Sequence, residues 1–510
     1  MLASRDDYAT VCSDFVWDVP TYFNIGVDVC DKWADDPDRL ALMHRRRDGS
    51  RRDYTFSQIK RLSNRFANVM RRHGIRRGDR VGILLPQSPE TAIAHVATYK
   101  MGGIAVPLFT LFGVDALEYR LGNCAAKALV TDKEGAAKIA EIRDLLPALE
   151  YVYVIDGAPE GCFDFKALST EASDQFEPVK TRADEPALII YTSGTTGNPK
   201  GACLTHRNIL NNAANVTDAM RFSPKDRLCI PVPFYHCFGM VMGNLGCITH
   251  GATMIYPAES FDAGAVLQAV HQERATALYG VPTMFIAQLA HPDFDKMDLS
   301  SLRTGIMAGS LCPTEVMKQV ISKMHMKEVQ IAYGMTETSP VSSQTGRDDP
   351  LEKRVTTVGK TQPHIESKVI DTNTGHILPR GEIGELCTRG YSVMLQYWND
   401  NDATAKAIDP AGWMHTGDLA IMDEQGYLQI VGRIKDMVIR GGENIYPKEI
   451  EEFLYSHPAI ADVQVTGIPD EKFGEELIAW VKFHTHATPV SETDLHDSSK
   501  DQIAHFKIPR

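Results

Sequence analysis

Short apolar runs separated by polar loops recur along most of the chain, and they predict the buried strands of an α/β protein. Residues 81–108 show the pattern clearly. An apolar run at 81–85 precedes a helical segment that begins at Ser88 and stops before Gly102, and a second apolar run follows at 104–108. Strand, helix and strand in this order predict two parallel strands joined by a crossover helix. We expect further strands at 128–131, 151–155 and 187–190, and helices at 27–34 and 56–73.

Three later apolar runs are each followed at once by a loop with polar residues or glycine. They lie at 228–232, 276–278 and 329–332. Because ligands of parallel α/β sheets bind beyond the carboxyl ends of the strands, we expect these loops to converge on one crevice. A helix at 448–455 and strands at 461–467 and 477–483 predict a small C-terminal α/β unit.

Composition and charge narrow the class of protein. With 510 residues, of which 43% are hydrophobic, the chain can bury large cores and form more than one domain. A formal charge of -13 argues against a general nucleic-acid binder. The ten cysteines form no C-x-x-C pair, so neither a zinc ribbon nor a disulfide scaffold is indicated. We therefore expect a protein of the reducing cytoplasm. We expect no signal peptide and no membrane span, since the longest apolar stretch, 237–256, is broken by polar residues.

The loop after the run at 187–190 has the composition of a phosphate-binding loop. Its glycines allow backbone N–H groups to approach an anion closely. It is not the common phosphate loop, because Pro199 stands where that motif needs a second glycine. A flexible surface loop is the alternative for a Gly/Ser/Thr-rich stretch. The residues that would bind phosphate are Thr192, Ser193, Gly194, Thr195, Thr196, Gly197 and Lys200.

The string 191–201 resembles the phosphate loop of the adenylate-forming superfamily, which includes acyl-CoA synthetases, luciferases and carrier-protein adenylation domains. Residues 19–33 resemble the N-terminal stretch of medium-chain acyl-CoA synthetases. Segments 333–340, 413–418 and 430–436 resemble further motifs of the superfamily and occur in its order. The resemblance implies a large N-terminal domain of mixed sheets and helices, a small mobile α+β C-terminal domain, and binding of ATP, Mg²⁺ and CoA.

The resemblance also assigns roles to single residues. Tyr333 would lie against adenine, Thr336 would contact phosphate and Glu337 would hold Mg²⁺. Asp418 would bind both ribose hydroxyls, because a carboxylate accepts two donors at once. Lys435 would be the pivot of the C-terminal domain, so the resemblance divides the chain into domains 1–434 and 435–510. Taken alone, Thr336, Glu337 and the charged run around Lys435 would be solvated turns. The remaining expected contacts to nucleotide or pantetheine are Gly309, Ser310, Gly334, Arg433, Gly441 and Gly442.

An apolar acyl pocket is implied in the same way. His236 would border the carboxylate and orient it, although a histidine beside aromatic residues is usually structural. The lining carries no charge, which favours a short or medium fatty acid or an aryl acid. Each lining residue could equally be an ordinary core residue. The lining comprises Phe238, Met242, Val281, Met307, Ala308, Gly309, Gly334 and Val341.

We therefore expect an AMP-forming acyl-CoA synthetase, with a homodimer as one option for its assembly. Two alternatives stay open. The acyl group could pass to a carrier protein, although no carrier domain is attached. The chain could also be a weakly catalytic nucleotide- or acyl-binding protein, since it ends at Arg510 without the lysine motif that closes the superfamily's C-terminal domain. We expect the full protein to continue beyond that point.

Overall fold

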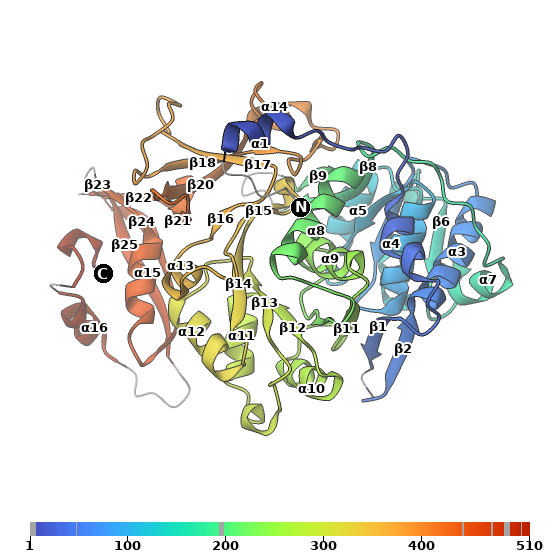
Figure 1. Cartoon of the computed structure of the whole chain (residues 1–510), viewed down its shortest axis with the longest axis horizontal. Helices are drawn as coiled ribbons and strands as arrows, with labels where there is room; N and C mark the ends of the chain where they lie inside the picture. Colours follow the sequence, from blue (N-terminus) through green and yellow to red (C-terminus); the bar gives the residue numbers. More distant parts are fainter. Residues whose placement is uncertain are drawn as a thin grey trace.

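The computed structural model describes residues 7–46, 48–192, 198–440, 443–470, 473–483, 490–500 and 502–509. Two large sheets lie side by side with helices between and around them (Figure 1). A four-stranded sheet lies at one end of the two large sheets, and a small C-terminal unit lies at the opposite side of the molecule from the first large sheet.

The first large sheet has eight strands in the order β19-β9-β8-β4-β3-β5-β6-β7. The predicted strand–helix–strand unit is confirmed, because β3 and β4 are parallel and α4 (Pro89–Lys100) joins them. The Ser88 hydroxyl begins this helix by accepting a hydrogen bond from the Thr91 N–H at 3.3 Å. The strands are β3 (Arg80–Leu84), β4 (Ile104–Pro107), β5 (Ala128–Thr131), β6 (Tyr151–Val154), β7 (Phe163–Asp164), β8 (Pro186–Thr192), β9 (Lys200–Thr205) and β19 (Gln396–Tyr397).

The second large sheet has nine strands in the order β16-β15-β14-β13-β12-β10-β11-β1-β2. Strands β10 to β14 run parallel, so the loops after them meet at one edge, as the sequence predicts. The strands are β1 (Leu40–Arg45), β2 (Arg51–Thr55), β10 (Arg227–Cys229), β11 (Thr253–Tyr256), β12 (Ala277–Gly280), β13 (Thr304–Ala308), β14 (Glu328–Gly334), β15 (Val341–Gln344) and β16 (Lys360–Thr361).

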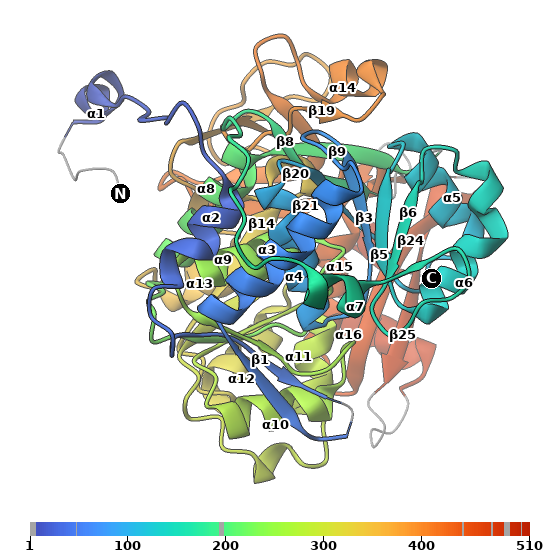
Figure 2. The same cartoon turned by 90° about the vertical axis from the view of Figure 1, so that its right-hand side faces the viewer.

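One extended core joins the two sheets. Helix α8 (His206–Ala219) and α9 (Gly246–Thr249) lie between them, and apolar residues of both sheets pack with α8 in this core. On the outer side, α3 (Phe56–Arg72) packs against α4 (Figure 2). The other helices are α1 (Tyr8–Asp14), α2 (Ile25–Val29), α5 (Val114–Asn123), α6 (Lys133–Ile142), α7 (Phe165–Glu171), α10 (Ala263–Glu273), α11 (Pro282–Leu289), α12 (Thr314–Lys323), α13 (Leu351–Thr356) and α14 (Asn401–Ala407).

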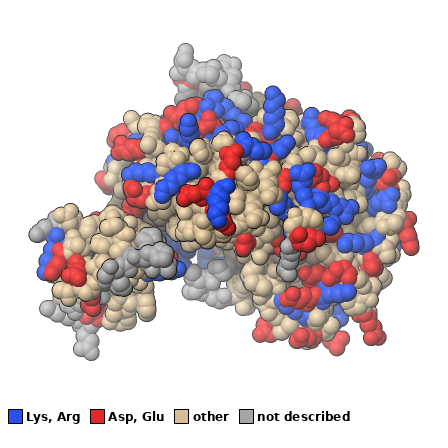
Figure 3. All heavy atoms as spheres, turned by 90° about the horizontal axis from the view of Figure 1, so that it is seen from below, with Lys and Arg blue, Asp and Glu red and all other residues tan. Residues whose placement is uncertain are grey.

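The C-terminal unit has its own sheet, in the order β23-β22-β25-β24, and its own apolar core. In the space-filling view of Figure 3 it is the lobe at the left, and a hollow separates it from the rest. This unit confirms the predicted α/β fold with a small C-terminal domain, whereas the boundary at residue 435 stays a prediction. Its elements are β22 (Val438–Arg440), β23 (Glu443–Ile445), α15 (Pro447–Tyr455), β24 (Ile460–Asp470), β25 (Gly474–Phe483) and α16 (Glu492–Ser499).

A four-stranded antiparallel sheet precedes this unit in the chain. Its strands are β17 (Ile365–Ile370), β18 (Gly384–Gly390), β20 (Met414–Met422) and β21 (Leu428–Arg433). Elsewhere, two elements differ from those expected from the sequence. The strand expected at 228–232 ends at Cys229, because Pro231 and Pro233 have no N–H to donate to a ladder. The helix expected at 27–34 is divided into α2 and a 3₁₀ turn, Asp31–Trp33. Among the described residues, no helix is long and apolar enough to cross a membrane.

Candidate active site

The predicted phosphate loop is the connection of a β-hairpin. Strands β8 and β9 are antiparallel, and Thr192 stands opposite Lys200 at the mouth of the hairpin. The Thr192 hydroxyl donates to the carbonyl oxygen of Lys200 at 3.4 Å. The predicted residues Ser193, Gly194, Thr195, Thr196 and Gly197 lie outside the described residues.

Lys200 and Glu337 are brought together by a tyrosine that the sequence analysis did not single out. Tyr397 lies on β19, which pairs with β9. The Lys200 ammonium lies 5.1 Å from the centre of the Tyr397 ring. The Tyr397 hydroxyl donates to Oε1 of Glu337 at 2.7 Å, and both side chains are buried. Burial raises the pKa of Tyr397, so the phenol keeps the proton that it donates.

Glu337 and Thr336 lie in a tight turn directly after β14. Residues Thr336–Thr338 form one turn of 3₁₀ helix, and the backbone carbonyl of Glu337 accepts from the Met394 N–H at 2.8 Å. Gly334 allows this turn to close. A Cβ atom on Gly334 would stand 1.8 Å from the carbonyl oxygen of Pro340, which no side chain could tolerate. The glycine therefore fixes where Thr336 and Glu337 point.

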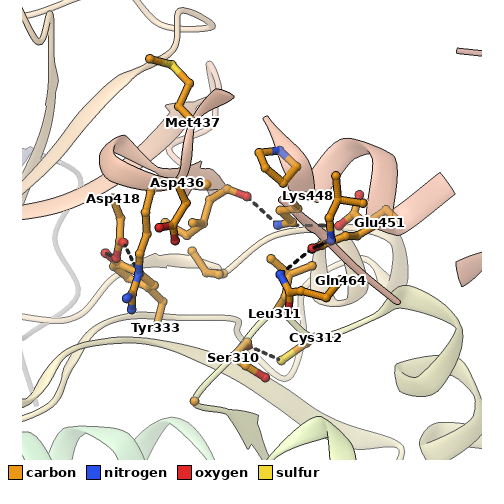
Figure 4. Close-up of a pocket in the computed structure, with 18 of the residues that line it drawn as sticks. Ser310, Leu311, Cys312, Tyr333, Asp418, Asp436, Met437, Lys448, Glu451 and Gln464 are labelled. Atoms are coloured by element: carbon orange, nitrogen blue, oxygen red, sulfur yellow. Dashed lines mark hydrogen bonds and ion pairs between the residues drawn. The ribbon is translucent and has the colours of Figure 1, made fainter. Parts of the chain in front are cut away.

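A cavity of about 740 Å³ lies between the ends of β13 and β14, the antiparallel sheet and the C-terminal unit. At its wall, the Tyr333 hydroxyl donates to Oδ2 of Asp418 at 2.7 Å, and Nε of Arg433 lies 3.3 Å from Oδ1 (Figure 4). Burial raises the pKa of the Asp418 carboxyl, while the hydrogen bond from Tyr333 and the charge of Arg433 act in the opposite direction. The cavity collects these predicted residues: Gly309, Ser310, Tyr333, Gly334, Asp418, Arg433 and Lys435.

A hydrogen-bonded cluster on β18 and β20 supports the turn that carries Asp418. The Glu385 carboxylate accepts from the Gly417 N–H at 3.1 Å and bonds Nδ1 of His415 at 2.9 Å. The Thr416 hydroxyl donates to the carbonyl of Leu386 at 2.6 Å. The sequence analysis missed Glu385, because only the pairing of β18 with β20 brings it beside the motif of Asp418.

The residues predicted to line an acyl pocket fall into three groups. Phe238, Met242, Ala308 and Val341 belong to the core between the large sheets, and the half-buried Val281 packs against them. Met307 packs in the separate core formed with α10 and α12, because successive residues of β13 face opposite sides. Gly309 and Gly334 line the cavity beside Asp418.

His236 precedes the apolar helical segment Phe238–Leu245 and keeps an exposed edge. The surrounding protein desolvates the ring, and this lowers the pKa of His236. Its Nδ1 accepts from the Phe238 N–H at 3.4 Å, which is the geometry of a neutral imidazole with the proton on Nε2. A free Nε2–H could donate to a carboxylate, and the orienting role of His236 stays a prediction.

The predicted pivot follows the cavity wall. Lys435 lies exposed in the 3₁₀ turn Ile434–Asp436, between β21 and the first strand of the C-terminal unit. Gly441 and Gly442, which we expect beside the pantetheine path, lie outside the described residues. The structure thus links the predicted phosphate residues Lys200 and Glu337 through Tyr397. It also gathers the predicted nucleotide residues Tyr333, Asp418 and Arg433 at the wall of the cavity.

Comparison with known proteins agrees with this geometry. The model of the AMP-binding enzyme family matches residues 30–398, and that of the AMP-binding enzyme C-terminal domain matches residues 449–510. YngI of Bacillus subtilis (strain 168) is 46% identical over 93% of this chain and 90% of its own length. The mitochondrial medium-chain acyl-CoA ligase ACSF2 of Danio rerio is 39% identical over 93% of this chain and 82% of its own.

A solved structure shows the same fold. ATP-bound MatB from Rhodopseudomonas palustris superposes with a TM-score of 0.85 and 32% sequence identity, over 96% of this chain and 93% of that one. The predicted resemblance and the predicted acyl-CoA synthetase class are confirmed by these relatives. The chain belongs to the AMP-binding enzyme family.

Proposed function

We propose that this protein is an AMP-forming carboxylate–CoA ligase for an apolar short- or medium-chain fatty acid or an aryl acid. A carboxylate is a poor acylating agent. Its oxygen first attacks the α-phosphorus of ATP, which forms acyl-AMP and releases pyrophosphate. The CoA thiol then attacks the acyl carbon, loses its proton, and displaces AMP to form the thioester. The observation that carries the proposal is the hydrogen bond of Tyr333 to Asp418, because it joins residues of two separate nucleotide motifs at the wall of one cavity.

The nucleoside of ATP binds in the cavity beside Asp418. This carboxylate accepts hydrogen bonds only, so it suits the two hydroxyls of a ribose. Tyr333 already donates to one of its oxygens, and the adenine packs against the face of this ring. The Arg433 side chain is 59% exposed, so it is free to turn towards ribose or phosphate.

The phosphates bind towards Lys200, Thr336 and Glu337. Fixed charges and donors stabilise the negative charge that builds up during phosphoryl transfer. Glu337 fits a Mg²⁺ ligand, because Tyr397 occupies only one of its carboxylate oxygens and hard cations prefer such oxygen donors. When bound, Mg²⁺ supplies charge neutralisation for the phosphates. Lys200 adds a cation at the mouth of the phosphate loop, where Ser193, Gly194, Thr195, Thr196 and Gly197 supply further donors.

The acid binds with its carboxylate towards His236 and its tail among apolar side chains. Phe238, Met242, Ala308 and Val341 carry no charge, which favours a hydrocarbon tail over a dicarboxylate. The buried amide of Asn212 fixes Val341 by two hydrogen bonds, at 2.7 and 3.0 Å. The medium-chain relative ACSF2 supports this length range. The C-terminal domain, which begins at Lys435, turns about that residue so that Gly441 and Gly442 guide the pantetheine arm of CoA.

Pyrophosphate release tests the proposal. The full-length protein is mixed with ATP, Mg²⁺ and a panel of straight-chain, branched and aromatic acids, with and without CoA. We expect sustained release only with CoA and only with apolar acids. A single turnover that CoA does not prolong would indicate a carrier protein as the acceptor. Absence of release with every acid would contradict the ligase.

The cytoplasmic location and a homodimer remain predictions of the sequence.

A further inference from the structure

A lysine of the C-terminal unit reaches across the central cavity. Lys448 lies in the first turn of α15, and its side chain lines the cavity together with Tyr333, Asp418 and Arg433 (Figure 4). Its ammonium donates to the carbonyl oxygen of Ile430 at 2.5 Å. Ile430 belongs to β21, on the other side of the predicted pivot. This contact therefore joins the two parts of the molecule that are expected to move.

The Lys448 ammonium has few other partners. The side chain is 14% exposed, and the carboxylate of Glu452, one turn later in α15, lies 3.7 Å away. The Cys312 thiol and the Glu451 carboxyl also face it. Desolvation lowers the pKa of Lys448, which reflects the cost of enclosing a charge. The Ile430 carbonyl offsets part of that cost only while the C-terminal unit keeps this orientation.

The contact is singular within the described part of the chain. Among hydrogen bonds between described residues, it is the one that joins residues 438–509 to residues that precede 434. The other polar contacts of α15 and β24 stay within the unit, such as Gln464 with Glu451 at 2.8 Å and Lys507 with Glu449 at 2.7 Å. Lys448 therefore supplies a direct polar link between the C-terminal unit and the sheet that precedes it.

We propose that Lys448 is a positioning residue that holds the C-terminal unit in this orientation and thereby sets the balance between acyl-AMP formation and thioester formation. The inference rests on the proposed function, since it requires two half-reactions at one site. Lys448 acts through the position of the unit and takes no part in bond making. Its removal lowers the population of this orientation, so the half-reaction that the orientation serves slows relative to the other.

The test compares Lys448→Met, Lys448→Arg and the control Lys500→Met in the full-length protein. Met keeps the length and buried stem of the side chain, and Lys500 is an exposed lysine of the same unit that pairs with Asp497 at 2.6 Å. Hydrogen–deuterium exchange of the ligand-free protein is measured over 428–433 and 447–455. Single-turnover rates of acyl-AMP and thioester formation are measured with an acid that the wild type accepts.

We expect Lys448→Met to speed exchange in both segments and to change the ratio of the two rates about tenfold, which corresponds to ~1.4 kcal/mol. Lys448→Arg should restore both, and Lys500→Met should match the wild type. Unchanged exchange, or faster exchange with an unchanged ratio, would overturn the inference. If the wild type released no pyrophosphate with any acid, the proposed function would fail, whereas the exchange data would still decide whether Lys448 holds the unit.

Discussion

Replacing Tyr397 with phenylalanine would remove the hydroxyl that holds Glu337 and leave the rest of the site in place. The hydroxyl donates to Oε1 at 2.7 Å, and the Tyr397 and Glu337 residues are 6% and 5% exposed. A hydrogen bond to a charged group contributes ~1.5–3 kcal/mol, and a buried partner left without it cannot turn to water. The ring would remain beneath Lys200, whose ammonium lies 5.1 Å from its centre. The change therefore isolates the orientation of one carboxylate.

We expect Tyr397→Phe to lower the free energy of unfolding by ~1.5–3 kcal/mol. We also expect pyrophosphate release to require a higher Mg²⁺ concentration, because Glu337 loses the contact that fixes its free oxygen. Chemical denaturation measures the first effect. The second is read from the initial rate of pyrophosphate release over a Mg²⁺ series at saturating ATP and acid.

Tyr391→Phe is the matched control. The Tyr391 hydroxyl is also buried, but it accepts a hydrogen bond from the Asn215 amide at 2.7 Å instead of donating one to Glu337. This variant should lose the ~1 kcal/mol of an uncharged hydrogen bond and keep the wild-type Mg²⁺ dependence. If Tyr397→Phe showed the same Mg²⁺ dependence as Tyr391→Phe, Tyr397 would have only a structural role, and the reasoning that it orients Glu337 for the metal would be refuted.

Three further predictions concern single residues. Burial lowers the pKa of His95 from 6.5 to about 4, so the stability linked to its neutral form is present above pH 6.5 and is lost as the pH falls towards 4. His95→Gln should recover up to ~3 kcal/mol of that loss. Denaturation curves recorded across this pH range give the free energy of unfolding at each pH. If this free energy fell with pH as steeply in the variant as in the wild type, His95 would not be the group responsible. Gly334→Ala should destabilise the protein by ~1–3 kcal/mol, because its Cβ would overlap the Pro340 carbonyl, and thermal unfolding measures this. Asp418→Ala should raise the KM for ATP ~10–100-fold through loss of charged hydrogen bonds, and an unchanged KM in the pyrophosphate assay would remove Asp418 from the ribose site.

Local patterns were sufficient to predict the central strands of the first large sheet and several helices. The segment 81–108 contains a continuous apolar run, a capping serine followed by proline, and a glycine stop. Each of these signals marks the start or end of an element that lies only a few residues away in the sequence. The same is true of α15, whose amphipathic spacing predicts its length to within one residue. The parallel order of β10 to β14 also follows from local rules, because helical crossovers connect most of these strands.

The candidate site could be predicted only where a motif carries its own residues. Tyr333 and Asp418 belong to separate motifs, and the structure joins them directly. Tyr397 lies in no motif, and it becomes part of the site only because the two-residue strand β19 pairs with β9 at the edge of the other large sheet. No hydrophobic period signals so short a strand, so the link between Lys200 and Glu337 could not be inferred from spacing.

The contact of Lys448 could be predicted from the sequence even less than that of Tyr397. In the sequence it stands four residues before Glu452 on a helix, a spacing that predicts a solvated ion pair of modest strength. In the structure its ammonium is enclosed against a carbonyl of β21, and that enclosure depends on where the whole C-terminal unit lies. If the unit turns about Lys435, the same lysine returns to water and recovers its hydration while it loses the carbonyl. At this residue the lost hydrogen bond and the regained hydration have opposite signs, so the net free-energy difference between the two orientations is small. A small difference lets both orientations be populated, so the domain can be held in one and still turn to the other.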